Sequence, residues 1–280
     1  SSGELQIESD DVEADIDISN LLSWTNSGGT INYLGSSGST TVFSSLEPYY
    51  NLVINSGGSS FTQNKDFAVN NNLAITAGTL ITDGYEIDLA GNLNLDGTLN
   101  ATNGSDGATT INIGGNWDAT NGTFTNAGST VIFDGSSAQA ITSHGESFNN
   151  LQIGTSDAGG GETFSVSTSD SLDVNGTFTI GSDAADTVTF DITNDTVYFA
   201  STVTLTNLDT FITAGSTVEF DGITALTSAT EAFNNVNIGN AGIAGTVTAQ
   251  GLTAIGGVLT VRNGTLNAND QALTINGNTI

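Results

Sequence analysis

The sequence predicts an all-β chain wound into a parallel β-solenoid, and three observations support this prediction. Short runs in which Val, Ile, Phe and Thr alternate, such as 130–133 (TVIF) and 187–190 (TVTF), are typical of strands. Thirty-five glycines, together with many Asn, Asp, Ser and Thr residues, supply the turns between such runs. The third observation is an internal repeat with a period of roughly ninety residues, which indicates stacked coils.

Composition limits the possible functions of the chain. Thirty acidic residues against two basic ones, Lys65 and Arg262, give a formal net charge of −28, which repels the phosphate backbone of nucleic acids. We therefore exclude nucleic acid as a partner. The 37% of hydrophobic residues is sufficient for a continuous but narrow core, and in the absence of cysteine this core must supply the stability.

The sequence also bears on the location of the protein. It contains no methionine and begins Ser1-Ser2-Gly3, which we interpret as a processed terminus left after export and signal-peptide removal. No apolar run is long enough for a bilayer-spanning helix, so no membrane span is expected. These features predict an extracellular or cell-surface protein.

The repeat is defined by two motifs that recur in the same order. The first is GSTTVF at 38–43, GSTVIF at 128–133 and GSTVEF at 215–220. The second is YYNLVI at 49–54, FNNLQI at 148–153 and FNNVNI at 233–238. We expect one solenoid domain over 1–280, with three degenerate modules at approximately 36–125, 126–212 and 213–280, and with 1–35 completing the truncated third module.

Glycines divide each module into coils. The spacing of Gly78, Gly97 and Gly122 predicts coils of about 19 to 25 residues, four to a module and about twelve in all. Alternate residues of each strand point inward. This alternation predicts a core that includes Val131, Phe133, Leu151, Ile153, Leu273 and Ile275.

The two motifs resemble the rungs of bacterial cell-surface parallel β-helix proteins, the class of adhesins and autotransporter passengers. The resemblance covers nearly the whole chain. It implies a right-handed winding, an exterior location and a role in adhesion or scaffolding, and it carries no catalytic signature onto any residue.

The two ends of the sequence continue each other. Matching the third module to the first places Asn278 on Asn92, and Gly3 and Leu5 then take the positions of Gly97 and Leu99. No polar cap is evident, and an uncapped solenoid end is a template for further strands. We expect a homopolymer, an open head-to-tail filament with interface residues Gly3, Leu5, Ile7, Leu273, Ile275 and Ile280.

A second interpretation explains the same pattern. A segment of a longer array, such as a fragment of a large adhesin or an autotransporter passenger, would show the same cyclic match, with flanking coils in place of a second molecule.

Catalysis is the weaker hypothesis, and we predict that the chain is not an enzyme. Paired carboxylates could serve a polysaccharide hydrolase, but thirty acids produce such pairs by chance. Lys65 and Arg262 lie in different modules, too far apart to act on one substrate as in a lyase. His144, the one histidine, is expected to be a loop residue, and no nucleophile, zinc or P-loop motif occurs.

Ligands other than a protein partner have weak signals. Calcium is the most plausible cofactor, and its candidate ligands form the densest acidic cluster, although a solubilising acidic strand is the preferred interpretation: Asp10, Asp11, Glu13, Asp15 and Asp17. Glycans could be attached at six Asn-x-Ser/Thr sequons, which begin at Asn100, Asn103, Asn121, Asn175, Asn194 and Asn263. Trp24 and Trp117 could stack on sugars, but their matching positions favour a structural role.

Overall fold

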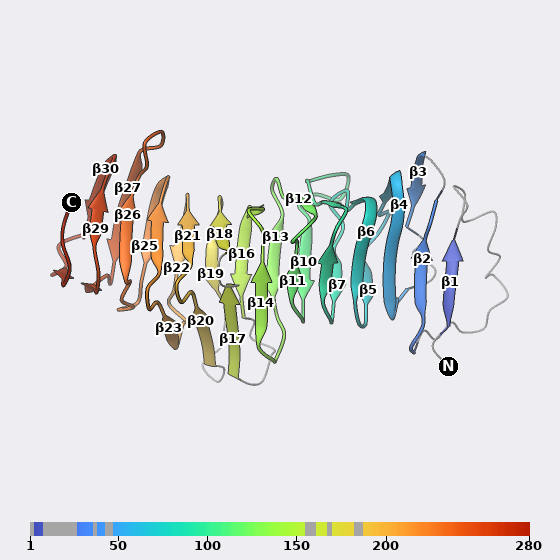
Figure 1. Cartoon of the computed structure of the whole chain (residues 1–280), viewed down its shortest axis with the longest axis horizontal. Helices are drawn as coiled ribbons and strands as arrows, with labels where there is room; N and C mark the ends of the chain where they lie inside the picture. The colour runs from blue at the N-terminus through green and yellow to red at the C-terminus, as the bar shows by residue number, and fades with distance from the viewer. Residues whose placement is uncertain are drawn as a thin grey trace. The chain divides into compact units, whose positions relative to one another are not determined.

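The computed structural model describes residues 3–7, 27–35, 38–42, 47–154, 161–166, 170–181 and 187–280. Every regular element in these ranges is a β-strand (Figure 1). The chain divides into two compact units, unit 1 (Ser1–Val131) and unit 2 (Ile132–Ile280). In the described ranges no helix has the length and hydrophobicity that a bilayer-spanning helix needs.

Unit 1 is built of parallel strands. One ladder runs in the order β1, β2, β4, β6, β8 and β11. A second ladder runs from β3 through the ends of β4 and β6 to β9 and then β12. A third joins β5, β7 and β10. The bounds are β1 (Glu4–Ile7), β2 (Thr30–Tyr33), β3 (Gly38–Thr41), β4 (Asn51–Thr62), β5 (Phe67–Val69), β6 (Leu73–Ile81), β7 (Ile87–Leu89), β8 (Leu93–Leu95), β9 (Thr98–Asn100), β10 (Thr110–Ile113), β11 (Trp117–Asp118) and β12 (Thr123–Thr125).

Unit 2 has the same construction, and β13 (Thr130–Phe133) leads into it. Its parallel ladders run β14-β17-β20-β23, β15-β18-β21-β24-β26-β29, β16-β19-β22-β25-β27-β30 and β28-β31. The bounds are β14 (Gln139–Thr142), β15 (Ser147–Phe148), β16 (Asn150–Ile153), β17 (Gly161–Val166), β18 (Ser171–Val174), β19 (Phe178–Ile180), β20 (Thr187–Asp191), β21 (Thr196–Phe199), β22 (Val203–Thr204), β23 (Thr210–Ile212), β24 (Thr217–Phe220), β25 (Ile223–Thr227), β26 (Asn235–Ile238), β27 (Gly245–Gln250), β28 (Ala254–Ile255), β29 (Leu259–Val261), β30 (Gly264–Asn267) and β31 (Thr274–Ile275).

The predicted fold class is confirmed: the chain is an all-β parallel β-solenoid. Strand registers set the length of each coil, which is short where Thr217 pairs with Asn235 and long where Leu151 pairs with Phe178. Because the longest coils exceed the predicted range, the two units hold about ten coils rather than about twelve.

The core forms as the alternation predicts. Val131, Phe133, Leu151 and Ile153 are buried, which confirms four of the six predicted core residues. The other two, Leu273 and Ile275, are only half-buried, so their prediction as core residues is wrong. The cause is their position in the last coil, where no described strand covers their outer side.

Asparagines tie successive coils together at the corners of unit 1. The Asn51 Oδ1 atom accepts hydrogen bonds from Asn71 Nδ2 (2.8 Å) and the Asn72 backbone N–H (3.3 Å). Asn72 Oδ1 accepts from the Asn92 N–H at 2.9 Å, and Asn92 Oδ1 accepts from the Asn116 N–H at 2.8 Å. This ladder satisfies backbone donors at the turns, where the strand pairing is interrupted.

The copies of a repeat motif form the same kind of corner in the coil, but they do not stack on one another. In the copy at 148–153, Phe148 lies in the ladder of β15 and Leu151 in the ladder of β16. In the copy at 233–238, Phe233 bridges to Ile255, and Val236 lies in the ladder that contains β15. The later copy is therefore shifted by one face of the coil.

Candidate functional site

The C-terminal coil, residues 264–280, is the first candidate site. β30 pairs with β27, β31 pairs with β28, and Thr279 bridges to Leu259. The bridge is supported by hydrogen bonds from the Leu259 N–H to the Asn278 carbonyl and from the Ile280 N–H to the Leu259 carbonyl, each 3.0 Å. This coil is thus held on one side, and no described strand pairs with its other side.

The inward side chains of the C-terminal coil are incompletely covered. Ile275 is in register with Ile255, which is fully buried, and Leu266 is in register with Val247, which is also fully buried. Leu266, Leu273 and Ile275 themselves are half-exposed. The coil therefore presents core-type side chains to whatever lies beyond it.

Ile280, another of the residues predicted for the interface, is placed differently from these inward side chains. Ile280 is one position beyond the Leu259–Thr279 bridge, so its side chain lies on the outer surface and is 75% exposed. Leu266 was missed, although the alternation in 264–267 is the signal that could have found it.

The N-terminal strand β1 is the second candidate site. Leu5 and Ile7 are in register with the buried Ile31 and Tyr33, so both point inward. Ile7 is buried and Leu5 is half-buried, and no described strand pairs with the other edge of β1. The Gly3 carbonyl accepts a hydrogen bond from the Thr30 N–H at 2.9 Å.

Leu5 and Leu99 match in the sequence, but they do not stack in the same column of in-register residues. Leu5 is the first residue of a column that continues through Ile31, Leu52 and Leu73. Leu99 is in register with Leu80, in the neighbouring column. The mismatch arises because every face uses the same alternation, so a sequence match does not distinguish one column from the next.

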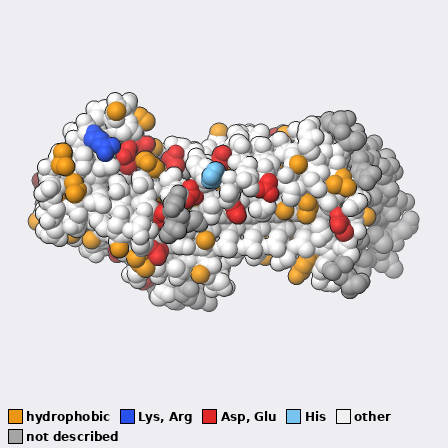
Figure 2. Space-filling view, in the orientation of Figure 1, with side chains coloured by type: hydrophobic (Ala, Val, Ile, Leu, Met, Phe, Trp, Pro, Cys, Tyr) orange, Lys and Arg blue, Asp and Glu red, His pale blue; other side chains and the backbone are white. Residues whose placement is uncertain are grey.

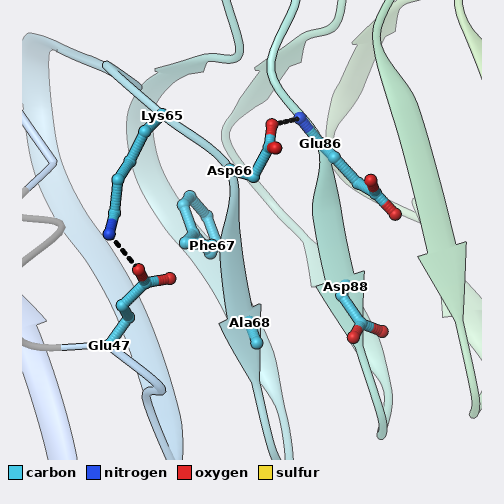
Figure 3. Close-up of a pocket in the computed structure, with 7 residues that line it drawn as sticks. All are labelled: Glu47, Lys65, Asp66, Phe67, Ala68, Glu86 and Asp88. Carbon is cyan, nitrogen blue, oxygen red and sulfur yellow. Dashed lines mark hydrogen bonds and ion pairs between the residues drawn. The ribbon is translucent and has the colours of Figure 1, made fainter.

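Unit 1 has a depression of about 480 Å³. Figure 3 shows the residues that line it: Glu47, Lys65, Asp66, Phe67, Ala68, Glu86 and Asp88. Lys65 forms an ion pair with Glu47, and Asp66 Oδ1 accepts the Glu86 backbone N–H at 2.8 Å. The Glu86 carboxylate in turn accepts a hydrogen bond from Asn112 Nδ2. These carboxylates link neighbouring coils.

Other acidic residues have the same structural use. Asp83 Oδ1 accepts the Ser105 N–H at 3.2 Å, Asp170 Oδ2 accepts the His144 N–H at 3.0 Å, and Asp209 Oδ2 accepts the Val188 N–H at 2.8 Å. Each bond joins one coil to the next. Part of the acidity is thus explained by backbone donors that need acceptors at the corners.

The calcium candidates Asp10, Asp11, Glu13, Asp15 and Asp17 lie outside the described residues, as does Trp24. Among the residues that the structure describes, no three acidic or histidine side chains are grouped to hold a metal ion. His144 is an exposed loop residue with φ 52°, as expected from the sequence.

Trp117 is fully buried and packs edge-on against Phe124, with 4.8 Å between the ring centroids. It therefore has a core role and not a sugar-stacking one. The sequon residue Asn100 is half-buried, and the other five are exposed: Asn103, Asn121, Asn175, Asn194 and Asn263.

One outward column of unit 2 concentrates charge. Asp173 on β18 is in register with Tyr198, which is in register with Glu219 and then with Asn237. Asn237 Nδ2 donates to Glu219 Oε2 at 3.2 Å. On the face that Figure 2 shows, acidic side chains lie close to a basic one.

Burial raises the pKa of three carboxyl groups of unit 2, of which only Asp173 belongs to this column. It raises the pKa of Asp173, and the nearby Asp221 carboxylate raises it further. Burial also raises the pKa of Asp221, partly offset by a backbone hydrogen bond, with a smaller increase from Glu219. Burial and the Asp209 charge raise the pKa of Glu231.

These shifts predict a pH dependence of stability. A carboxyl whose pKa is higher in the folded state binds more protons there than in the unfolded state, so stability falls as pH rises through the folded pKa. We expect the melting temperature of the chain to increase as pH is lowered from 7 toward about 4, the ordinary carboxyl range. Thermal unfolding followed by circular dichroism at a series of pH values measures this.

The matched variants separate this effect from general charge repulsion. Asp221→Asn should raise the melting temperature at pH 7 and reduce its increase on acidification, because it removes a partly buried carboxylate. Asp106→Asn, at an exposed position of unit 1, removes the same charge without the burial. Identical pH profiles for the two variants would contradict the assignment.

The fold and these sites define the class of the protein, a parallel β-solenoid repeat protein. Comparison of the chain with protein-family models, curated proteins and solved structures finds no match.

Proposed function

We propose that the chain is a structural subunit of an extracellular filament and that it assembles head to tail, with the C-terminal coil of one copy stacked on β1 of the next. The observation that carries this proposal is the C-terminal coil itself. Leu266, Leu273 and Ile275 point to the core but are half-exposed, while their in-register neighbours Val247 and Ile255 are fully buried. Another coil placed over them would complete their burial.

Backbone chemistry supports the same joint. A terminal parallel strand has N–H and C=O groups on its free edge that can pair with a further strand. β1 at one end, and β30 and β31 at the other, have such edges among the described residues. Inward side chains on both ends, such as Leu5 and Ile275, allow the core to continue across the joint.

Charge is compatible with this contact. Seven of the thirty acids lie between Glu4 and Asp17, whereas the segment 251–280 contains one acid, Asp270, and one base, Arg262. The acidic end of one copy would thus meet a nearly neutral end of the next, without strong like-charge repulsion.

A structural role agrees with the uses that the carboxylates have in the fold. Asp66, Asp170 and Asp209 accept backbone N–H groups from neighbouring coils. The extracellular part of the proposal is supported by the resemblance of the rungs to those of cell-surface β-helix proteins.

Ile275→Asp tests the joint. The side chain at this position is half-buried in the single molecule, and a carboxylate there would become fully buried without a partner when another coil stacks on it. We therefore expect filaments to disappear while the preceding coils keep their fold. Electron microscopy of the purified chain measures assembly, and circular dichroism measures the fold. Thr274→Asp is the matched control, because its exposed side chain adds the same charge on the outer surface; it should still form filaments.

Two results would contradict the proposal. Filaments formed by Ile275→Asp as readily as by Thr274→Asp would show that the terminal coil is not the joint. An unmodified chain that stays monomeric over a range of concentration and salt would favour the alternative, in which flanking coils of a larger adhesin or passenger cover these ends.

A further inference from the structure

Unit 2 has an outward face without charged side chains, which we name the threonine face. It consists of the outward residues of β19, β22, β25, β27 and β30. One column is formed by Thr179, Thr204, Thr227 and Gln250, which are in register. No Asp, Glu, Lys or Arg occurs at the outward positions of these described strands.

Two more columns complete the threonine face. The second is Ala225, Thr248 and Asn267, and the third is Ile223, Thr246 and Thr265. Ile223 is 81% exposed, an unusual degree for a large aliphatic side chain. Threonine has few rotamers in a strand, so the hydroxyl and methyl groups form a rigid array that repeats with the strand spacing of about 4.8 Å.

Charge indicates what can approach this face. Two copies, each with a net charge of −28, repel each other most strongly where acidic faces meet, such as the column of Asp173 and Glu219. No acidic residue occupies an outward position of the threonine face, so this local repulsion is reduced there; the nearest acid in the sequence is Asp221, at the corner before β25. Two such faces can interdigitate their threonines in the way that in-register sheets pack in steric zippers.

Unit 1 has a similar column that is less suited to such a contact. Ser60, Thr79, Thr98 and Thr123 are in register there. Asp96 borders them, and a depression of about 530 Å³ interrupts the surface. A hollowed face does not mate closely with a copy of itself.

The area of the threonine face sets the strength of the contact. Five strands about 4.8 Å apart, with a mean length of about 13 Å, span roughly 300 Å² on one copy. The roughly 600 Å² buried by two copies is below the ~1,200 Å² of a stable interface. One contact would not hold two single molecules together, but a filament repeats it in every subunit, so that the contacts add in avidity.

We propose that the threonine face is a lateral contact between copies of this chain, through which filaments pair side by side. This inference rests on the proposed function, because it requires the repetition that a filament supplies. Added salt should favour pairing, since it screens the repulsion of the surrounding acids while leaving the uncharged contact intact.

Thr248→Asp tests the contact by placing a carboxylate at an exposed position of the threonine face. We expect this variant to form filaments as the unmodified chain does, but with the paired fraction in electron micrographs reduced about tenfold or more, because pairing would bury an unpaired charge. The control is Thr210→Asp, which adds the same charge at an exposed position on β23, outside the threonine face. It should pair normally.

The outcomes separate the two proposals. Filaments that remain single at all salt concentrations, or that pair equally in Thr248→Asp and the unmodified chain, would overturn the lateral contact alone. The absence of any filament would overturn both proposals. A third outcome is that single filaments bind insoluble, uncharged cellulose and that the Thr248→Asp variant loses this binding. This outcome would overturn the lateral contact between copies and would show that the threonine face binds polysaccharide.

Discussion

Replacement of Phe178 with alanine is expected to lower the free energy of unfolding by about 3–5 kcal/mol. Phe178 is fully buried, and its ring lies 5.3 Å from that of Phe190 and 5.1 Å from that of Phe199. The variant would leave a cavity between two coils, because backbone pairing of β19 with its neighbours prevents the walls from collapsing. Urea unfolding followed by circular dichroism measures the loss.

The control for this experiment is Ile223→Ala. It removes a large aliphatic side chain from a strand of the same unit, but the side chain is 81% exposed, so the change in unfolding free energy should stay within about 0.5 kcal/mol. Similar losses in the two variants would show that the packing of Phe178 against Phe190 and Phe199 is not the source of stability.

Gly78→Ala is expected to destabilise unit 1 by about 2–4 kcal/mol. Gly78 has φ +83°, and a Cβ atom at this position would lie 2.3 Å from the Ser56 carbonyl oxygen and 2.8 Å from that of Ser59. Both neighbours are backbone atoms, so relief requires one coil to move away from the next. Thermal unfolding followed by tryptophan fluorescence reports the effect, since Trp117 is buried in this unit.

Gly57→Ala is the matched control in the same unit. A Cβ at Gly57 would meet no atom within 4 Å, and its φ lies outside the left-handed region. We expect little change, within about 0.5 kcal/mol. If Gly57→Ala were as harmful as Gly78→Ala, the close approach of coils at Gly78 would not be the cause.

The candidate assembly site could be predicted in part from the sequence. Alternation places Leu273 and Ile275 on the inward side, and the structure puts both in the uncovered terminal coil. Ile280 was predicted for the same interface, and the chain bridges through Thr279, which places the Ile280 side chain on the outer surface. A single step of register separates it from the inward positions, because such a step turns a side chain to the opposite side of a strand.

The threonine face could not be predicted in this way. Thr179, Thr204 and Thr227 are unevenly spaced in the sequence and become neighbours only through strand pairing. The absence of charge on that face is likewise a property of the assembled coil, since the same chain is strongly acidic as a whole.

The fold class, the inward and outward sides of most strands, and the places where coils turn all follow from the amino-acid sequence. These are local properties, because strand alternation has a period of two and because glycine and asparagine suit the corners for steric and hydrogen-bonding reasons. The face that each strand occupies and the residues that stack on one another became known only from the strand pairing. All faces accept the same motif, and coils of unequal length absorb insertions at their corners, so the spacing in sequence does not determine the column.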